Sequence, residues 1–135
     1  MTTYLQARSR ILDAIPDMDG WTVHRDGQAP PSATPPWVVV SVRETGRARA
    51  ESGYAGAVLL EVRLTVVSAG EASVNAKCEQ LHDLLDNLRP DGLGPLTASR
   101  DSGSYPSDLT DTRTGMAWTM RVLQFTTSYT TQKEL

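Results

Sequence analysis

The sequence predicts an α+β domain with a mostly antiparallel β-sheet, an N-terminal helix and a second helix packed on one face of the sheet. Three observations predict this fold. Two segments carry apolar residues at helical spacing, and others have the composition or alternation of strands. Their order along the chain is helix, strand, strand, helix, then one or two strands. No segment repeats at a fixed period, which excludes solenoids and propellers. The 135 residues fit a single domain over residues 1–135.

The first helix is predicted over residues 3–15. Thr3 can cap its N-terminus, and Gln6 completes a capping-box pattern three residues later. The chain then enters a stretch, residues 16–36, that holds five of the eight prolines. We expect this stretch to be a surface connection with a short strand-like segment at residues 21–24. The apolar stripe of the helix consists of Leu5, Ile11, Leu12 and Ile15.

Two strands are predicted next, at residues 37–42 and 57–67. The first is a β-branched run directly after two prolines, which sit naturally at the entry of a strand. In the second, the alternate residues from Leu60 to Val66 are aliphatic and would share one face. The two strands fit an antiparallel hairpin with a long loop at residues 44–56. Loops of this length are more often interaction elements than passive connectors.

A second helix is predicted over residues 72–88. Ser68 and Glu71 form a capping-box pattern where the helix would open, and the turn-forming residues 89–92 would end it. Its polar side chains surround one narrow apolar stripe, as expected for a helix that packs on a sheet. The stripe consists of Val74, Cys78, Leu81, Leu85 and Leu88.

The end of the chain is predicted to form one or two further strands. Residues 96–99 are a possible short strand, residues 116–130 a long final strand, and residues 131–135 a flexible tail. The apolar residues of the final strand change parity near Val122, which predicts either burial on both sides or a β-bulge. The two sets are Trp118, Met120 and Val122, and then Leu123, Phe125 and Tyr129.

Charge and cysteine content narrow the class of protein. The chain has 13 Lys and Arg against 16 Asp and Glu, a formal net charge of −3, so it lacks the overall basic charge of a nucleic-acid binder. A single cysteine rules out an internal disulfide and agrees with a reducing compartment. No segment has the length and apolar character of a membrane span or signal peptide. We therefore expect a soluble protein made in the cytoplasm.

A catalytic constellation is not recognisable in the sequence. His24 and His82 lie on unrelated elements, and His82 falls on the solvated flank of its helix near Asp86. Cys78 lies on the apolar stripe, where a thiol behaves as a small hydrophobe. One cysteine and two distant histidines make no recognisable zinc site, and the glycines at 92 and 94 lack the rest of a phosphate-binding motif. We expect no enzyme, and no catalytic, metal-ligating or cofactor-binding residue.

The loop at residues 44–56 holds the candidate functional residues. Two arginines alternate in it, Arg47 and Arg49, and Tyr54 follows. Arginine and tyrosine are enriched at interface hot spots, so these three residues are candidates for contacts with another subunit or with a partner protein. The alternative interpretation is a flexible, solvated hairpin tip.

The segments in this order resemble the tail terminator (tail completion) proteins of long-tailed bacteriophages, particularly those that infect actinobacteria. The resemblance runs from about residue 4 to residue 130 and lies in the order of the segments rather than in one short motif. The segments are the N-terminal helix with its proline-rich exit, Pro35-Pro36-Trp37-Val38-Val39-Val40, the Gly/Arg loop, Leu60 to Ser68 leading into a helix, Arg89-Pro90, and the closing strand from Trp118 to Tyr129.

The resemblance implies a structural protein of the virion neck, assembled in the host cytoplasm. Members of this family form a homohexameric ring on the head-proximal end of the tail tube. The ring stops polymerisation of the tail tube protein and offers a surface to the head connector, or head-closure protein. DNA would pass through the ring without specific binding, and the family carries no catalytic residues.

Two alternatives stay open at the level of sequence. Another neck component, a head-closure or adaptor protein, is also a small α+β ring former, and only a terminator would control tail length. A small cytoplasmic enzyme or ligand-binding domain could share this layout of sheet and helices. It would need a deep pocket with convergent polar groups.

Overall fold

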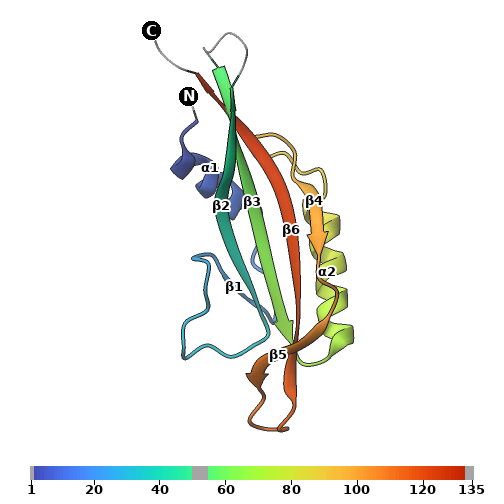
Figure 1. Cartoon of the computed structure of the whole chain (residues 1–135). Coiled ribbons are helices and arrows are strands. Elements are labelled where there is room, and N and C mark those ends of the chain that lie inside the picture. Colours follow the sequence, from blue (N-terminus) through green and yellow to red (C-terminus); the bar gives the residue numbers. More distant parts are fainter. Residues whose placement is uncertain (1, 50–54, 133–135) are drawn as a thin grey trace.

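The computed structural model describes residues 2–49 and 55–132 and confirms the predicted α+β fold class. Its elements are α1 (Tyr4–Ala14), β1 (Thr22–His24), β2 (Trp37–Arg49), β3 (Ala55–Ser68), α2 (Glu71–Leu85), β4 (Thr97–Asp101), β5 (Tyr105–Thr110) and β6 (Ala117–Gln132). The strands form one six-stranded sheet in the order β1-β2-β3-β6-β4, and β5 also pairs with β6 (Figure 1). β1 is parallel to β2, and the other pairs are antiparallel.

The three long strands form the body of the sheet, and one face of it, the core face, carries the main core. β3 pairs with β6 from Ala55↔Gln132 to Ser68↔Thr119 without a shift in register. Alternate side chains of each strand point to the core face, where α1 and α2 cover them. Burying each large aliphatic or aromatic side chain contributes roughly 1.5–3 kcal/mol to folding. Fully buried residues on this face include Val38, Val40, Leu60, Leu64, Leu123 and Phe125.

The first helix begins as predicted and buries the predicted stripe at Ile11, Leu12 and Ile15, but not at Leu5. Thr3 accepts a hydrogen bond from the backbone of Gln6, whose side chain in turn accepts one from the Thr3 backbone, so the capping box is confirmed. Ala7 is fully buried, whereas Leu5 is 74% exposed. The prediction was wrong at Leu5. This residue lies six positions before Ile11, so its side chain is about 240° around the helix from that of Ile11.

The second helix confirms the apolar stripe through Leu85 but not the predicted ends. Its N-cap is Gly70, without a side-chain cap, because Ser68 is buried at the end of β3 and shares a hydrogen bond with Ser73 instead. The helix ends at Leu85 rather than at residue 88, since the backbone after it turns through Asn87 at a φ of 63°. Leu88 then lies outside the helix and accepts a backbone hydrogen bond from Leu96.

The final strand is buried on both sides, one of the two outcomes that its parity change predicts. Its unbroken register with β3 excludes a β-bulge at Val122 between those two strands. Leu123 and Phe125 enter the main core, whereas Trp118 joins Trp37 and Val67 in a second cluster on the opposite face. The strand runs to residue 132, so the predicted flexible tail was wrong at 131–132, and 133–135 lie outside the described residues.

The predicted long loop at residues 44–56 was also wrong. β2 continues to Arg49 and β3 begins at Ala55, so only residues 50–54, which lie outside the described part of the chain, separate the two strands. Gly and Ala are poor strand formers, but here β3 pairs with β2 as far as Arg49 and is itself paired to β6. A β-bulge lies between Glu44 and Gly46, where the register of β2 on β3 shifts by one residue.

Two short strands complete the sheet edges. The predicted segment at residues 21–24 is confirmed as β1, and the predicted one at 96–99 is β4, shifted towards Asp101. β5 was not predicted, because Pro106 and its polar neighbours have low strand propensity. It pairs with the start of β6 irregularly, through Tyr105, Pro106 and Thr110.

Candidate assembly interface

The ends of β2, β3 and β6 extend past both helices as a three-stranded arm (Figure 1). We define the arm as residues 47–49, 55–58 and 129–132, starting from the rung that joins Arg47, Val58 and Tyr129. Val58 and Tyr129 are the last core residues in this direction. Beyond them come small or polar residues, which bury little apolar area within this chain. The arm therefore adds surface rather than core.

The predicted interface residues belong to this arm or to its tip. The bulge in β2 changes the parity of the strand and brings Arg47 onto the same face as Glu44, with which it forms an exposed ion pair. The hydrogen bond from Arg47 raises the pKa of its guanidinium above the ordinary value. Arg49 pairs with Gly56 two positions further along β2, and Tyr54 lies outside the described residues.

The opposite face of the sheet, here called the open face, carries a row of polar residues across four strands. Ser41 on β2 pairs with Arg63 on β3, Arg63 with Gln124 on β6, and Gln124 with Arg100 on β4. Arg63, Gln124 and Arg100 line a shallow depression. In the described part of the chain no helix covers this row.

The open face has a surplus of positive charge. Arg43 and Arg63 both contact the Glu61 carboxylate, at 2.9 and 3.6 Å, and the Arg63 side chain remains 47% exposed. Arg100 has no ion pair with any residue in 2–49 or 55–132. Two guanidinium groups thus share the Glu61 carboxylate, and a third, on Arg100, adds positive charge to this face. Leu59, on the same face nearer the arm, is 42% exposed.

The outward face of α2, on the other side of the molecule, has the opposite charge. Glu79 and Asp83 lie one turn apart on it, and neither pairs with a basic group among the described residues. Leu84 follows Asp83, lies about 100° further around the helix and is 40% exposed although it is aliphatic. We call Glu79 and Asp83 the acidic helix face.

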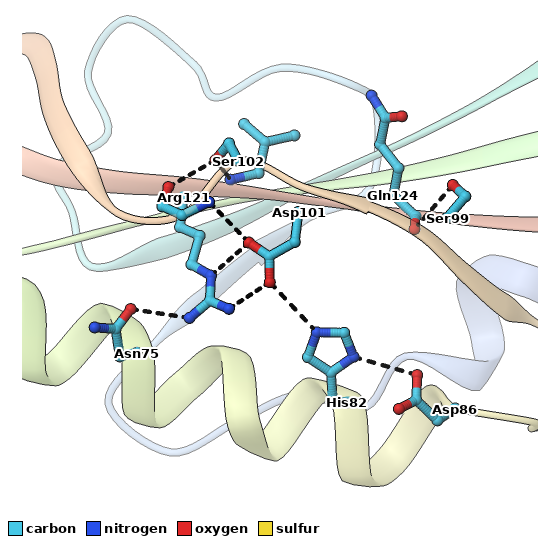
Figure 2. Close-up of polar contacts among 10 residues, drawn as sticks. Asn75, His82, Asp86, Ser99, Asp101, Ser102, Arg121 and Gln124 are labelled. Carbon is cyan, nitrogen blue, oxygen red and sulfur yellow. Dashed lines mark hydrogen bonds and ion pairs between the residues drawn. The ribbon is translucent and has the colours of Figure 1, made fainter.

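A polar network ties β4 and β6 to α2 (Figure 2). Arg121 donates two hydrogen bonds to Asp101 and one to Asn75 on the helix. Mainly because of the hydrogen bonds from Arg121, the pKa of Asp101 falls to about 2. His82 lies 3.2 Å from Asp86 and 3.8 Å from Asp101, so both ring nitrogens face carboxylates.

The hydroxyl nearest to this network is engaged elsewhere. Ser102 donates to the carbonyl of Gly103 and accepts from the amide of Val122, and it forms no hydrogen bond with His82. His82 is also less solvated than predicted: its side chain is 27% exposed, and its ring lies 5.6 Å from the ring of Phe125. The network therefore links β4 and β6 to α2. It does not place the Ser102 hydroxyl on the His82 imidazole.

Cys78 and His24 were the other sequence candidates for chemistry. Cys78 is buried as the helical stripe predicts, and burial raises the pKa of its thiol to about 11. His24 packs edge-on against Trp37, with ring centroids 5.7 Å apart, rather than lying in a solvated connection. Its Nε2 is buried without a hydrogen-bond partner in the described structure.

The sequence indicated the arm but not the two charged faces. Arg63 alternates with the aliphatic residues of a predicted strand, which was a usable signal for the polar face of that strand. Nothing in the sequence shows that Arg100 lies two strands away from it.

Residues 2–49 and 55–132 contain no cluster of three or more potential metal ligands and no helix long and apolar enough to cross a membrane. No family model matches the chain, and no curated protein matches it either.

Proposed function

We propose that this chain is a phage tail terminator. Copies of it would form a ring, hexameric by resemblance to the family, on the head-proximal end of the tail tube. The ring stops addition of further tube protein and presents a surface to the head connector or head-closure protein. Its place is the neck of the virion, after assembly in the host cytoplasm.

The observation that carries the proposal is the three-stranded arm. It extends beyond Val58 and Tyr129, where the core of this chain ends, so the small and polar residues that follow bury little apolar surface within this domain. An element of this kind gains stability when it packs on a neighbour, because burial removes its apolar surface from water and its polar groups can form hydrogen bonds with the partner. The arm carries Arg47 and Arg49 and leads to Tyr54, the three candidate contact residues.

The charge of the chain also supports a ring around DNA. A net charge of −3 gives no overall attraction to phosphates, so DNA can slide through without being held. A closed ring requires two different patches of one subunit to meet in a head-to-tail contact. The arm, the open face and the acidic helix face are separate patches that can serve in such contacts.

The test is the length of tail tubes grown in the presence of the protein. Purified tube protein polymerises with or without this chain, and electron microscopy measures tube length and the ends of the tubes. We expect short tubes with extra density at one end. Tubes of unchanged length with bare ends would refute the proposal.

A phage that lacks this chain separates a terminator from a neck adaptor. Loss of a terminator gives over-long tails, whereas loss of an adaptor or head-closure protein gives tails of normal length that do not join heads. Arg113→Ala is a suitable control variant for complementation, because Arg113 is exposed and lies between β5 and β6, at the end of the sheet away from the arm. This control is expected to restore normal tails.

A further inference from the structure

The open face and the acidic helix face have opposite charges and lie on opposite sides of one domain. The open face carries Arg43, Arg63 and Arg100, and among the described residues Glu61 is the carboxylate that forms ion pairs with arginines of this row. The acidic helix face carries Glu79 and Asp83 without basic partners in the described structure. We infer that these two faces bind each other between neighbouring copies of this chain, as the lateral contact of the proposed ring.

The spacing of the charges is compatible with such a contact. Arg63 and Arg100 are separated by β6, so their backbones lie roughly 10 Å apart. Glu79 and Asp83 are one helical turn apart, about 6 Å. Arginine side chains are long enough to span the difference, and they can bind a carboxylate with two parallel hydrogen bonds.

Exposed apolar groups beside the charges support the same contact independently of charge. Leu59 is 42% exposed on the open face, and Leu84 is 40% exposed on α2, about 100° around the helix from Asp83. Half-buried Thr65 and Val122 pair with each other next to the row of Arg63 and Arg100, so the open face offers aliphatic groups beside its charges. A charged contact with apolar groups inside it excludes water, which strengthens the ion pairs.

The position of the two faces determines what the contact builds. A patch that binds a different patch on the far side of the next copy gives a head-to-tail assembly, which closes into a ring or continues as a filament. Edge-to-edge pairing of β2 is less suited to this role. Its free edge is interrupted by a bulge and carries Arg43, Glu44 and Arg47, features that discourage pairing with another strand.

A second copy fits the open face better than DNA does. Binding to a duplex depends on many cationic contacts with phosphates, and here Glu61 lies among the arginines and the whole chain is negative. A helix that carries carboxylates satisfies the arginines without repulsion from the rest of the chain.

The inference is tested by reversing charges and then restoring complementarity. One variant combines Arg63→Glu with Arg100→Glu, and a second combines Glu79→Lys with Asp83→Lys. Each variant alone has like charges on both faces, so we expect its self-association to weaken about 100-fold in sedimentation experiments at low salt. Mixed in equal amounts, the two variants are complementary again, and we expect oligomers of alternating subunits.

Thermal unfolding first verifies that both variants fold. We expect that they do, because all four substituted side chains are exposed. Arg113→Glu, which changes the charge at the turn between β5 and β6 and not in the row of Arg63 and Arg100 or on the acidic helix face, serves as the matched control and should associate like the wild type. Unchanged association of both variants, or a mixture that stays monomeric, would overturn the inference. So would a wild-type chain that is monomeric at every protein and salt concentration, whether or not it binds duplex DNA through these arginines.

This inference rests on the proposed function for its setting, but the two fail in different ways. If the charge-reversed variants dissociate while the wild type does not shorten tail tubes, the contact stands and the terminator proposal falls. If the wild type shortens tubes and both variants shorten them equally well, the contact falls and the terminator proposal stands.

Discussion

Asp101 is the residue through which pH is expected to act on the fold. Its hydrogen bonds from Arg121 lower its pKa to about 2, whereas an unfolded aspartate titrates near 3.9. The stabilisation is therefore present above about pH 4 and is lost as the pH falls towards 2. Since 33% of the side chain is exposed, solvent screening reduces the contribution to about 1 kcal/mol.

We predict that Asp101→Asn lowers the free energy of unfolding by about 1 kcal/mol at pH 7 and that the difference from the wild type shrinks between pH 4 and pH 2. Urea unfolding at a series of pH values measures both effects. Asp108→Asn is the control, because Asp108 is exposed, lies outside the proposed contact faces and has no ion pair among the described residues. An equal loss in both variants would contradict the role of the Arg121 pair.

Phe125 tests the core at the same scale. It is the only phenylalanine of the chain and is fully buried between the sheet and α2, in contact distance of His82. Phe125→Ala is expected to lower the free energy of unfolding by about 3–5 kcal/mol through lost transfer energy and the cavity left behind. Thr126→Ala, at the exposed position next to it, should cost far less in the same denaturation experiment.

At the scale of elements, the sequence predicts the helices and strands that a local pattern of apolar residues determines. It does not predict strand segments that depend on pairing with another strand. The alternation from Leu60 to Val66 and the stripe from Val74 to Leu85 identify β3 and α2, because burial on one face imposes their periods. The extension of β2 to Arg49 is not a local property. It depends on the ladder with β3, which the sequence near residue 46 does not reveal.

The candidate site divides in the same way. Arg47, Arg49 and Tyr54 are recognisable as a local cluster of interface residue types in the sequence. The open face is not recognisable, because Arg63 and Arg100 come together only when β6 inserts between β3 and β4. Long-range strand order was therefore the missing information for the site.

Gly56 provides the prediction for the arm as an element. A Cβ at this position would lie 2.6 Å from the carbonyl oxygen of Ala48, closer than packed atoms allow. Gly56→Ala should push β2 away from β3, cost about 1–3 kcal/mol where the arm is formed, and speed amide hydrogen exchange at its paired positions. Gly46→Ala is the matched control, since its nearest neighbour is a Leu59 methyl at an ordinary 3.7 Å. Equal exchange in the two variants would contradict the close approach.

At the scale of the whole molecule, the sheet is longer than its own core requires. The main core ends at Val58 and Tyr129, yet three strands continue beyond it as the arm. On either side of the sheet, uncovered charge of opposite sign remains. A domain built to work alone would have little use for both features, whereas a subunit of a ring uses one for lateral contact and the other to reach the tube or the head connector.

The last prediction separates these two uses. Replacing Arg47, Arg49 and Tyr54 together by alanine should leave the fold intact, because the Arg47 pair with Glu44 is exposed and contributes no core. If the arm reaches the tube, the triple variant still forms oligomers through the charged faces but no longer shortens tail tubes. Thermal unfolding, sedimentation and tube length by electron microscopy measure the three properties, with Arg113→Ala as control. A triple variant that forms rings and ends tubes like the wild type would remove these residues from the interface, whereas one that folds but loses its oligomers would assign the arm to the contact between subunits instead.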